Sequence, residues 1–377
     1  MVRSLVTATL AAALAATSLG VAEAAEAPSD ATRSGVMQLL PFPEGHVSSS
    51  ADLINDAGQI VGATSDGRGV HTATRWDADL SITPLKALTS AGTLVWTRAL
   101  GPDGTVAGAA DVGDRVDHAV TWDASGTPTR LEEPAGYVNS TANDINEDHV
   151  VVGVASDNRA ARAVRWGRDG TATLLPLPFL ARYSEALYVD AQGVAYGWAS
   201  SGYTKQAVRW DTEGNVTELG TFGGQWSEIR DVNDRGTAVG SAAAPGYESW
   251  AAIAPPSGTF QQLPGGVDSS SAVDVNNHDD TLGAVNSQYT LWKDGAMIPL
   301  RPLTGTQWVQ VYGLNDSGTT VGQSGNSATV WDVNGTPTAL QTGPMADSSA
   351  ANEINNAGQV LGWAYTWDQG RQAAVWR

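Results

Sequence analysis

The most constraining feature of this 377-residue chain is a repeat of about 43 residues that occurs eight times. Each unit contains the pattern I/V-N-D-x-G-x-x-V-G, a variable stretch, and then A-V-x-W-D-x-x-G-x-x-x-x-L. The second glycine of the pattern sets the register of the units and falls at Gly62, Gly108, Gly153, Gly197, Gly240, Gly283, Gly322 and Gly362. Steps of 39 to 46 residues at this regularity are not due to chance. The fold must therefore be built from eight similar units.

Each unit contains four strand-like segments separated by turn signals. In the third unit they cover about residues 140–144, 150–155, 161–166 and 171–175. They are rich in Val, Thr, Leu and Trp and are bounded by Asn, Asp and Gly, which favours sheet over helix. Four strands in 40 to 45 residues are the period of a propeller blade. A stacked solenoid also repeats, but it needs capping units at both ends.

The two ends of the repeat region favour a closed ring. The last unit stops after its third strand, at residues 374–377, while residues 35–40 form an isolated segment with the character of a fourth strand. Pairing of the two would complete the eighth blade and cover edges that otherwise promote aggregation. The sequence therefore predicts an all-β fold, a closed eight-bladed β-propeller of four-stranded blades whose last blade is completed by the N-terminal strand.

The first residues are typical of a secretory signal peptide. Arg3 precedes an apolar stretch, residues 5–21, and then Ala22-Glu23-Ala24. This order predicts cleavage after Ala24, with cleavage after Ala27 as the alternative. We thus expect a signal peptide at 1–24, a short linker at 25–34 and a single propeller domain at 35–377. The repeat units are expected at about 47–90, 91–136, 137–180, 181–222, 223–266, 267–303, 304–344 and 345–377, the last with strand 35–40.

Composition narrows the classes of function. The chain has no cysteine, which excludes thiolate metal sites and thiol nucleophiles. Its net charge of −19 repels phosphate backbones, so nucleic acid is not an expected partner. No second apolar run reaches the length of a membrane span. The mature protein is expected to be extracellular, without a membrane span, and monomeric.

The repeats resemble a known family. The segment at residues 118–122 reads His-Ala-Val-Thr-Trp, and residues 55–62 and 315–322 follow N-D-x-G-x-x-V-G. In these segments the chain resembles the HAF-type extracellular bacterial repeat proteins over almost all of its mature length. The sequence departs from the signature in units that replace its His with Arg162, Gln206, Gln288, Ser327 or Gln372. The resemblance implies a secreted repeat protein and transfers no chemistry.

Two repeated elements have a structural interpretation. One tryptophan position recurs on the third strand of seven units: Trp76, Trp122, Trp166, Trp210, Trp292, Trp331 and Trp376. Its regular spacing predicts packing between blades, and unit five has Ala254 there, so one junction must be filled differently. The Asn-Asp-x-Gly segments are predicted turns. Calcium loops are the alternative, for example at residues 274–280, but no unit keeps the required alternation of oxygen ligands. No cofactor is therefore expected.

Strand direction alternates within a blade, so the loops fall on two faces. The first-to-second and third-to-fourth turns are short and share one face, while the variable loops share the other. Variable loops on a rigid scaffold are common binding sites. Aromatic residues outside the repeat pattern gather in these loops, and the ligand-binding candidates are Tyr183, Trp226, Trp250, Trp308, Trp363 and Trp367. They suit stacking on sugars or anchoring a protein; the alternative is that some belong to the core.

Two acidic residues provide a catalytic alternative. Glu185 and Glu228 occupy equivalent positions in adjacent units, and two carboxylates on neighbouring sheets could form the acid pair of a glycosidase. The repeat explains the same equivalence without catalysis. The sequence therefore favours a secreted, non-catalytic propeller that binds extracellular glycan or protein through the face of variable loops. The alternatives are a polysaccharide hydrolase or lyase, and a purely structural surface protein.

Overall fold

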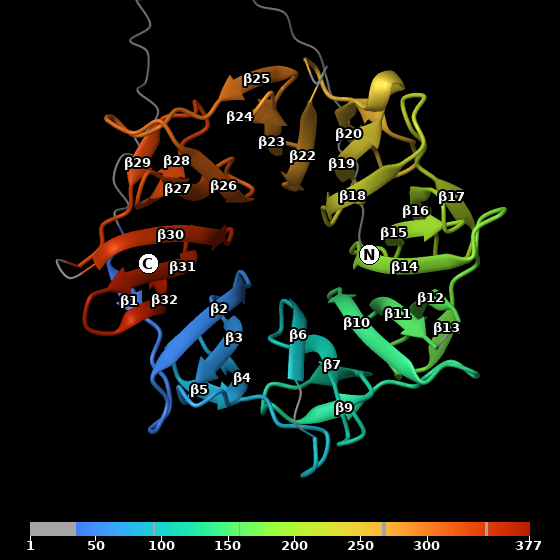
Figure 1. Ribbon diagram of the computed structural model, residues 1–377, viewed down its shortest axis with the longest axis horizontal. Helices are drawn as coiled ribbons and strands as arrows, with labels where there is room; N and C mark the ends of the chain where they lie inside the picture. Colours follow the sequence, from blue (N-terminus) through green and yellow to red (C-terminus); the bar gives the residue numbers. More distant parts are fainter. Residues whose placement is uncertain (1–34, 93–94, 158, 266–268, 344–345) are drawn as a thin grey trace, which may run out of the picture. The chain divides into compact units, whose positions relative to one another are not determined.

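The computed structural model describes residues 35–92, 95–157, 159–265, 269–343 and 346–377. The predicted signal peptide, 1–24, and the linker, 25–34, lie outside these residues. The described chain forms eight four-stranded antiparallel sheets that stand around a ring, with one 3-10 turn at Pro245–Tyr247 (Figure 1). The predicted fold class, a closed eight-bladed β-propeller, is confirmed. No helix of the described residues is long and apolar enough to cross a membrane.

The strands of each blade are given from the innermost outward. Blade 1 contains β2 (Ser48–Ile54), β3 (Ile60–Ser65), β4 (His71–Trp76) and β5 (Ile82–Pro84), and blade 2 contains β6 (Val95–Leu100), β7 (Val106–Ala110), β8 (His118–Trp122) and β9 (Pro128–Arg130). Blade 3 contains β10 (Asn139–Ile145), β11 (Val151–Ser156), β12 (Ala161–Trp166) and β13 (Ala172–Leu174). Blade 4 contains β14 (Tyr183–Val189), β15 (Ala195–Ser200), β16 (Lys205–Trp210) and β17 (Val216–Glu218). Blade 5 contains β18 (Ser227–Val232), β19 (Ala238–Ala243), β20 (Ser249–Ala254) and β21 (Gln261–Gln262), and blade 6 contains β22 (Ser270–Val275), β23 (Thr281–Val285), β24 (Gln288–Lys293) and β25 (Ala296–Pro299). Blade 7 contains β26 (Val309–Leu314), β27 (Thr320–Ser324), β28 (Ser327–Trp331) and β29 (Pro337–Ala339). Blade 8 contains β30 (Ala346–Ile354), β31 (Val360–Thr366), β32 (Gly370–Trp376) and β1 (Met37–Leu39).

The repeat glycine is required by a close approach inside every blade. The innermost strand bulges at the same place in each unit, as between Ala142 and Asp144 in β10. Gly153 lies opposite this bulge, and a Cβ there would be 2.0 Å from the carbonyl oxygen of Thr141. Any larger residue would push the two strands apart. The glycine therefore fixes the bulge, which bends the innermost strand beside the ring axis.

The repeat tryptophans lie between blades and tie each blade to the one before it. Trp166 is fully buried, and its indole N–H donates to the carbonyl oxygen of Glu132, just after the last strand of blade 2. The same bond joins Trp210 to Pro176 at 2.7 Å. A buried indole thus contributes both a large apolar area and a satisfied donor. This pairing explains why one tryptophan position recurs in seven units.

The junction between blades 4 and 5 is filled differently, as the alanine at position 254 requires. Phe260 and Tyr196 pack there against Ala254 within one buried cluster. The Tyr196 hydroxyl donates to Asp190 at 2.9 Å, so its polar end is satisfied. Two smaller rings from neighbouring positions therefore replace one indole.

The Asn-Asp-x-Gly turns join the blades into a belt. The Asn55 side chain accepts the Gln59 amide at 3.0 Å, which closes its own turn, and donates to the carbonyl oxygen of Gly101 in the next blade at 2.9 Å. Asn355 of blade 8 donates to the carbonyl oxygen of Asn55 at 2.9 Å, so the belt continues across the closure. We call the face that carries these turns the turn face.

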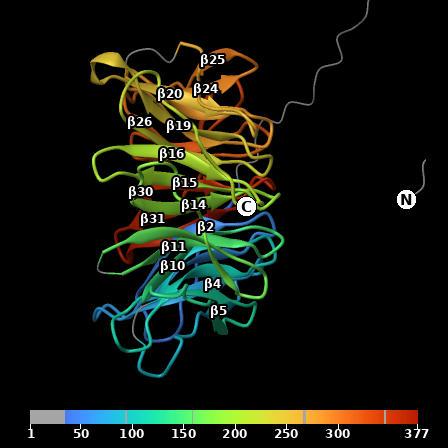
Figure 2. The ribbon, with the colours of Figure 1, turned by 90° about the vertical axis from the view of Figure 1, so that its right-hand side faces the viewer.

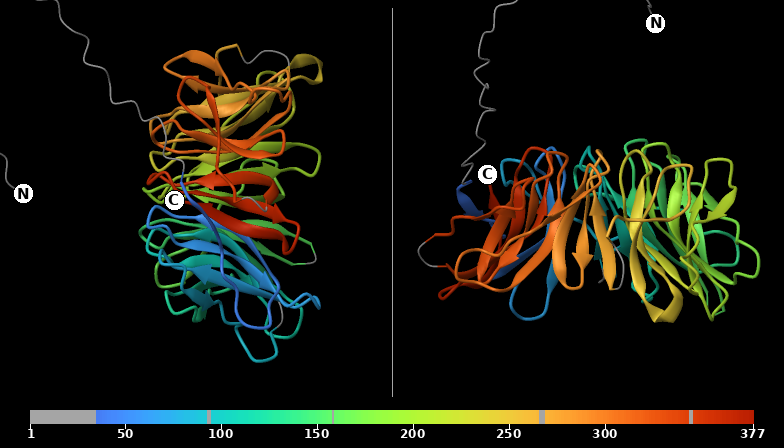
Figure 3. Two further views of the ribbon diagram at one scale, coloured as in Figure 1. Left: turned by 90° about the vertical axis from the view of Figure 1, so that its left-hand side faces the viewer. Right: turned by 90° about the horizontal axis from the view of Figure 1, so that it is seen from above.

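The ring closes through the N-terminal strand. β1 pairs with β32 in antiparallel register, Met37 opposite Trp376 and Leu39 opposite Ala374. The Leu40 side chain is buried, and its amide donates to Ala373 at 2.9 Å. Side views show the strands running between the two faces of the disc, with the loops gathered at these faces (Figures 2 and 3). We call the face opposite the turn face, which carries the variable loops, the loop face.

Candidate functional site

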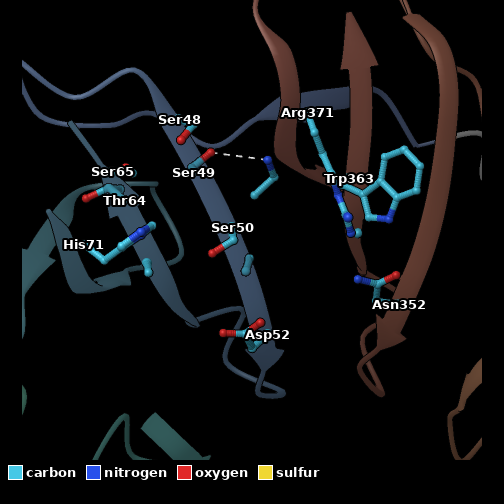
Figure 4. A pocket seen from close by; sticks show the side chains of 14 residues that line it. Ser48, Ser49, Ser50, Asp52, Thr64, Ser65, His71, Asn352, Trp363 and Arg371 are labelled. Carbon is cyan, nitrogen blue, oxygen red and sulfur yellow. Dashed lines mark hydrogen bonds between the residues drawn. The ribbon is translucent and has the colours of Figure 1, made fainter. Parts of the chain in front are cut away.

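A cavity of about 350 Å³ opens where the ring closes, between blade 8 and blade 1. Figure 4 shows Trp363, Arg371 and Asn352 on one wall, from blade 8, and Ser48, Ser50 and Asp52 on β2 of the facing blade. Ser48 begins β2, so the cavity lies toward the loop face. Ser49, Thr64, Ser65 and His71 complete the polar lining. The cavity thus combines one indole with hydroxyl, amide, carboxylate and guanidinium groups.

The indole and the guanidinium form a single unit. Arg371 stacks over the Trp363 ring at 4.4 Å from the ring centre. Trp363 lies opposite Ala373 in the β31–β32 ladder, two residues from Arg371, so the hairpin register brings together residues that are eight apart in sequence. The ring holds the cation by a cation–π contact. No described carboxylate pairs with Arg371, so its N–H donors remain available to a ligand.

The base of the cavity is held by buried hydrogen bonds between the two blades. Ser49 donates its amide to the side-chain oxygen of Gln372 at 3.0 Å, and Gln372 donates to the carbonyl oxygen of Val47 at 3.1 Å. The Ala373 amide donates to the Ser49 hydroxyl at 3.3 Å. These bonds fix the spacing of the walls, which is the condition for a preformed binding site.

Acidic groups beside the cavity hold protons more tightly than usual. Partial burial in the cavity wall raises the pKa of Asp52. Behind it, burial and then the charge of Asp52 raise the pKa of Glu353 to about 8. Glu353 also accepts the Ile54 amide at 2.9 Å, so it satisfies an N–H of the innermost strand of blade 1. This part of the wall therefore carries less negative charge at neutral pH than its composition suggests.

The predicted aromatic candidates are distributed around the ring. Trp363 alone among them lines the cavity. Four others are exposed: Tyr183 and Trp226 at 36%, Trp308 at 48% and Trp367 at 72%. Trp250 is half-buried, packs on Phe222 at 5.6 Å between ring centres and donates to Glu248 at 3.2 Å. It belongs with the packed residues that the sequence left open as the alternative.

The two acidic candidates have separate partners. Glu185 accepts a hydrogen bond from Asn143 of blade 3 at 3.0 Å. Glu228 pairs with Arg230 of its own strand at 2.7 Å. Neither residue lines the cavity between blades 8 and 1. Each carboxylate thus has an interaction that explains its presence without an acid–base role.

The histidine of the segment at residues 118–122 has a structural partner. His118 is buried, and its Nδ1 lies 2.7 Å from Glu133, which also binds Arg130. Within the described ranges, no group of three or more His, Cys, Asp or Glu side chains is placed to hold a metal ion. Residues 274–280 are the segment with the alternative of a calcium loop, and its Asp280 forms an ion pair with Lys293.

Several cavity residues were not singled out from the sequence. Arg371, Asn352, Asp52 and His71 have no motif of their own and meet only because two blades face each other. One signal was present: Gly-Trp-Ala occurs at residues 362–364 and again at 197–199, where the other units place smaller or polar residues. The repeat position therefore identifies Trp198 as the equivalent of the predicted candidate Trp363.

Known proteins resemble the chain in fold only. No protein-family model matches it, and no curated protein matches its sequence. TolB from Acinetobacter baumannii is 15% identical over 74% of this chain and 62% of that chain, with a TM-score of 0.42. Prolyl oligopeptidase B from Galerina marginata is 12% identical over 87% of this chain and 54% of that chain, with a TM-score of 0.52. The chain thus spans little more than half of the second protein. At 12% identity the likeness to prolyl oligopeptidase B shows the fold alone.

Proposed function

We propose that this protein is a secreted, non-catalytic propeller that binds extracellular glycan in the cavity between blades 8 and 1. The observation that carries the proposal is the lining of that cavity, an indole surrounded by hydroxyl, amide and charged groups. Sugar rings present an apolar C–H face and a rim of hydroxyls, so they need both an aromatic surface and hydrogen-bonding partners. A protein ligand is the alternative within the same class of function.

The position of the cavity supports this proposal. It lies toward the loop face, between walls that buried hydrogen bonds hold in place. Sites of about this volume, largely formed before the ligand arrives, are typical of small-ligand binding. The hydrolase alternative depends on Glu185 and Glu228, which have partners elsewhere.

Replacing Trp363 with alanine should weaken glycan binding about tenfold, because an aromatic contact contributes about 1 kcal/mol or more to a buried interface. The ligand would be chosen from a glycan array, and its Kd measured by titration calorimetry on the full mature chain. Trp96→Ala is the matched control, since Trp96 is 54% exposed on β6 and lies outside the cavity. Equal loss in both variants, with circular dichroism unchanged, would contradict the site.

Export can be tested separately. Protein recovered from the culture medium of its host should begin at Ala25, or at Pro28 if cleavage follows Ala27, because the A-x-A pattern marks the peptidase site. N-terminal sequencing or intact mass spectrometry measures this directly. Protein outside the cell that still carries Met1 would overturn the signal peptide and with it the secreted part of the proposal. The HAF-type resemblance stays a prediction that agrees with export.

A further inference from the structure

The indole–cation unit of the cavity occurs a second time in the ring. In blade 4, Lys205 lies over the Trp198 ring at 4.7 Å from its centre. Trp198 is opposite Ala207 in the β15–β16 ladder, two residues from Lys205, which is the same register as that of Trp363 and Arg371. The two pairs are therefore equivalent through the repeat and face the next blade in the same way.

The other six blades lack this combination. At the tryptophan position they carry Ala63, Ala109, Val154, Ser241, Ala284 and Gln323. At the cation position they carry His71, Asp117, Ala161, Ser249, Ser287 and Asn326. Tryptophan and a lysine or arginine thus occur together in two units only, four units apart. Blades 4 and 8 lie on opposite sides of the ring (Figure 1). Packing between blades does not require the pair, since six junctions form without it.

The support beneath the two pairs is also duplicated. Gln206 follows Lys205 and donates to the carbonyl oxygen of Gln225 in blade 5 at 3.0 Å, as Gln372 does to Val47 in blade 1. The Ser227 hydroxyl accepts the Ala207 amide at 3.0 Å, as Ser49 does from Ala373, but this bond belongs to the scaffold, because four other junctions also have it, at Ser140, Ser184, Ser270 and Ser349. The facing wall differs: Trp226, Glu228 and Arg230 stand where Ser48, Ser50 and Asp52 stand in the other site. Trp226 is equivalent to Ser48 in the repeat, so this exposed ring is expected beside the Trp198–Lys205 pair.

The charges indicate the kind of sugar. Neither the Lys205 ammonium nor the Arg371 guanidinium has a carboxylate partner or a hydrogen bond among the residues that the structure describes, although the chain carries a net charge of −19. A stacked indole orients the cation and leaves its N–H groups free for an anion. Beyond about 8 Å the remaining negative surface is screened at physiological salt. A carboxylated pyranose offers an apolar ring face together with the anion that such a site lacks.

We infer that the chain has two repeat-related subsites, at blades 8/1 and 4/5, each of which binds a uronic acid residue of an acidic polysaccharide. This inference rests on the proposed glycan function and deepens it. Two subsites on one rigid ring bind a polymer with a higher apparent affinity than either site alone. They also allow one molecule to join two polymer chains.

The test uses the full mature chain and a short acidic probe, trigalacturonate, with its methyl ester as the uncharged counterpart. Titration calorimetry should give two sites per chain for the parent, one for Arg371→Gln, one for Lys205→Gln and none for the double variant. Arg159→Gln removes an exposed cation from a loop of blade 3 on the same face and should keep two sites. The methyl ester should bind at least tenfold more weakly.

The outcomes separate this inference from the proposed function. An unchanged stoichiometry in Lys205→Gln, or equal binding of the acid and its ester, overturns the acidic two-site inference. If only a neutral glycan binds and Trp363→Ala weakens its binding about tenfold, the proposed function stands while the inference fails. If no glycan of either kind binds and only a protein ligand is found, both fail.

On immobilised polygalacturonate, loss of one subsite should lower the apparent affinity about 100-fold.

Discussion

A chain that lacks residues 35–40 should unfold at a much lower temperature and associate in solution. The deletion removes β1 and the buried Leu40, and it leaves the outer edge of β32 without a partner. A lost buried leucine costs about 2–5 kcal/mol, and each lost backbone hydrogen bond about 1 kcal/mol more. We therefore expect a loss of about 5 kcal/mol or more in the free energy of unfolding. Thermal unfolding and light scattering measure the two effects.

A rescue variant makes this prediction specific. Residues 35–40 are appended after Arg377 through a turn copied from another blade, so that the fourth strand follows the third as it does in blades 1 to 7. This restores the β32–β1 ladder and the buried Leu40 side chain. Stability and the monomeric state should return. A deletion variant that stays monomeric and melts at the parent temperature would show that closure contributes little.

The sequence predicted what depends on the repeat. Eight units, four strands in each and a split last blade follow from spacing and turn chemistry alone, and the structure confirms them. The tryptophan position was recognised because one indole serves the same function at seven junctions. Even the exception at Ala254 was visible, although its replacement by Phe260 and Tyr196 was not. Those rings come from other positions of the unit, and nothing in the local pattern shows which way they pack.

The candidate site was predicted only in part. Trp363 stood out as an aromatic residue in a variable segment, but Arg371 did not, because their contact depends on the hairpin register. The buried acids were missed for a related reason. Asp144, Asp231, Asp274 and Glu353 occupy one position of the repeat, which holds Leu53, Ala99, Tyr188 and Gly313 in the other units, so the acid is visible in half of the units but its burial is not. Their shifted pKa values depend on the neighbouring blade, which a single unit of sequence does not show.

The second large effect concerns pH: the protein should be most stable near pH 5 and lose stability as the pH rises to 9. Burial raises the pKa of Asp144 to about 7 and that of Glu353 to about 8. Burial also raises the pKa values of Asp231 and Asp274, which share a hydrogen bond. The folded state therefore binds protons that the unfolded chain releases near pH 4. Between about pH 4 and 8 this difference makes the free energy of unfolding fall with rising pH.

Carboxylates with the opposite shift do not reverse this trend. The amide of Thr127 is the main cause of the lowered pKa of Asp123, and the amide of Arg159 has the same effect on Asp157. Stability from a lowered pKa is complete above the unfolded value and is lost only as the pH falls below about 4. The buried carboxyls reduce stability as the pH rises, whereas the carboxylates with lowered pKa values reduce it only below about pH 4. The free energy of unfolding therefore has a maximum between these two pH ranges.

Glu353→Gln isolates one member of the buried set. Glutamine cannot ionise, and its carbonyl oxygen can still accept the Ile54 amide that Glu353 accepts at 2.9 Å. The variant should match the parent near pH 5 and exceed it at pH 9 by on the order of 3 kcal/mol, since one pKa unit corresponds to about 1.4 kcal/mol and residual solvent contact reduces the full value. Glu218→Gln, at an exposed position of β17, controls for the change in net charge. Chemical denaturation at both pH values measures the difference. Two outcomes would contradict this prediction: a parent that is equally stable at pH 5 and 9, or a Glu353→Gln variant whose free energy of unfolding changes with pH in parallel with that of the parent. Either result would show that these carboxyls ionise without cost to the fold.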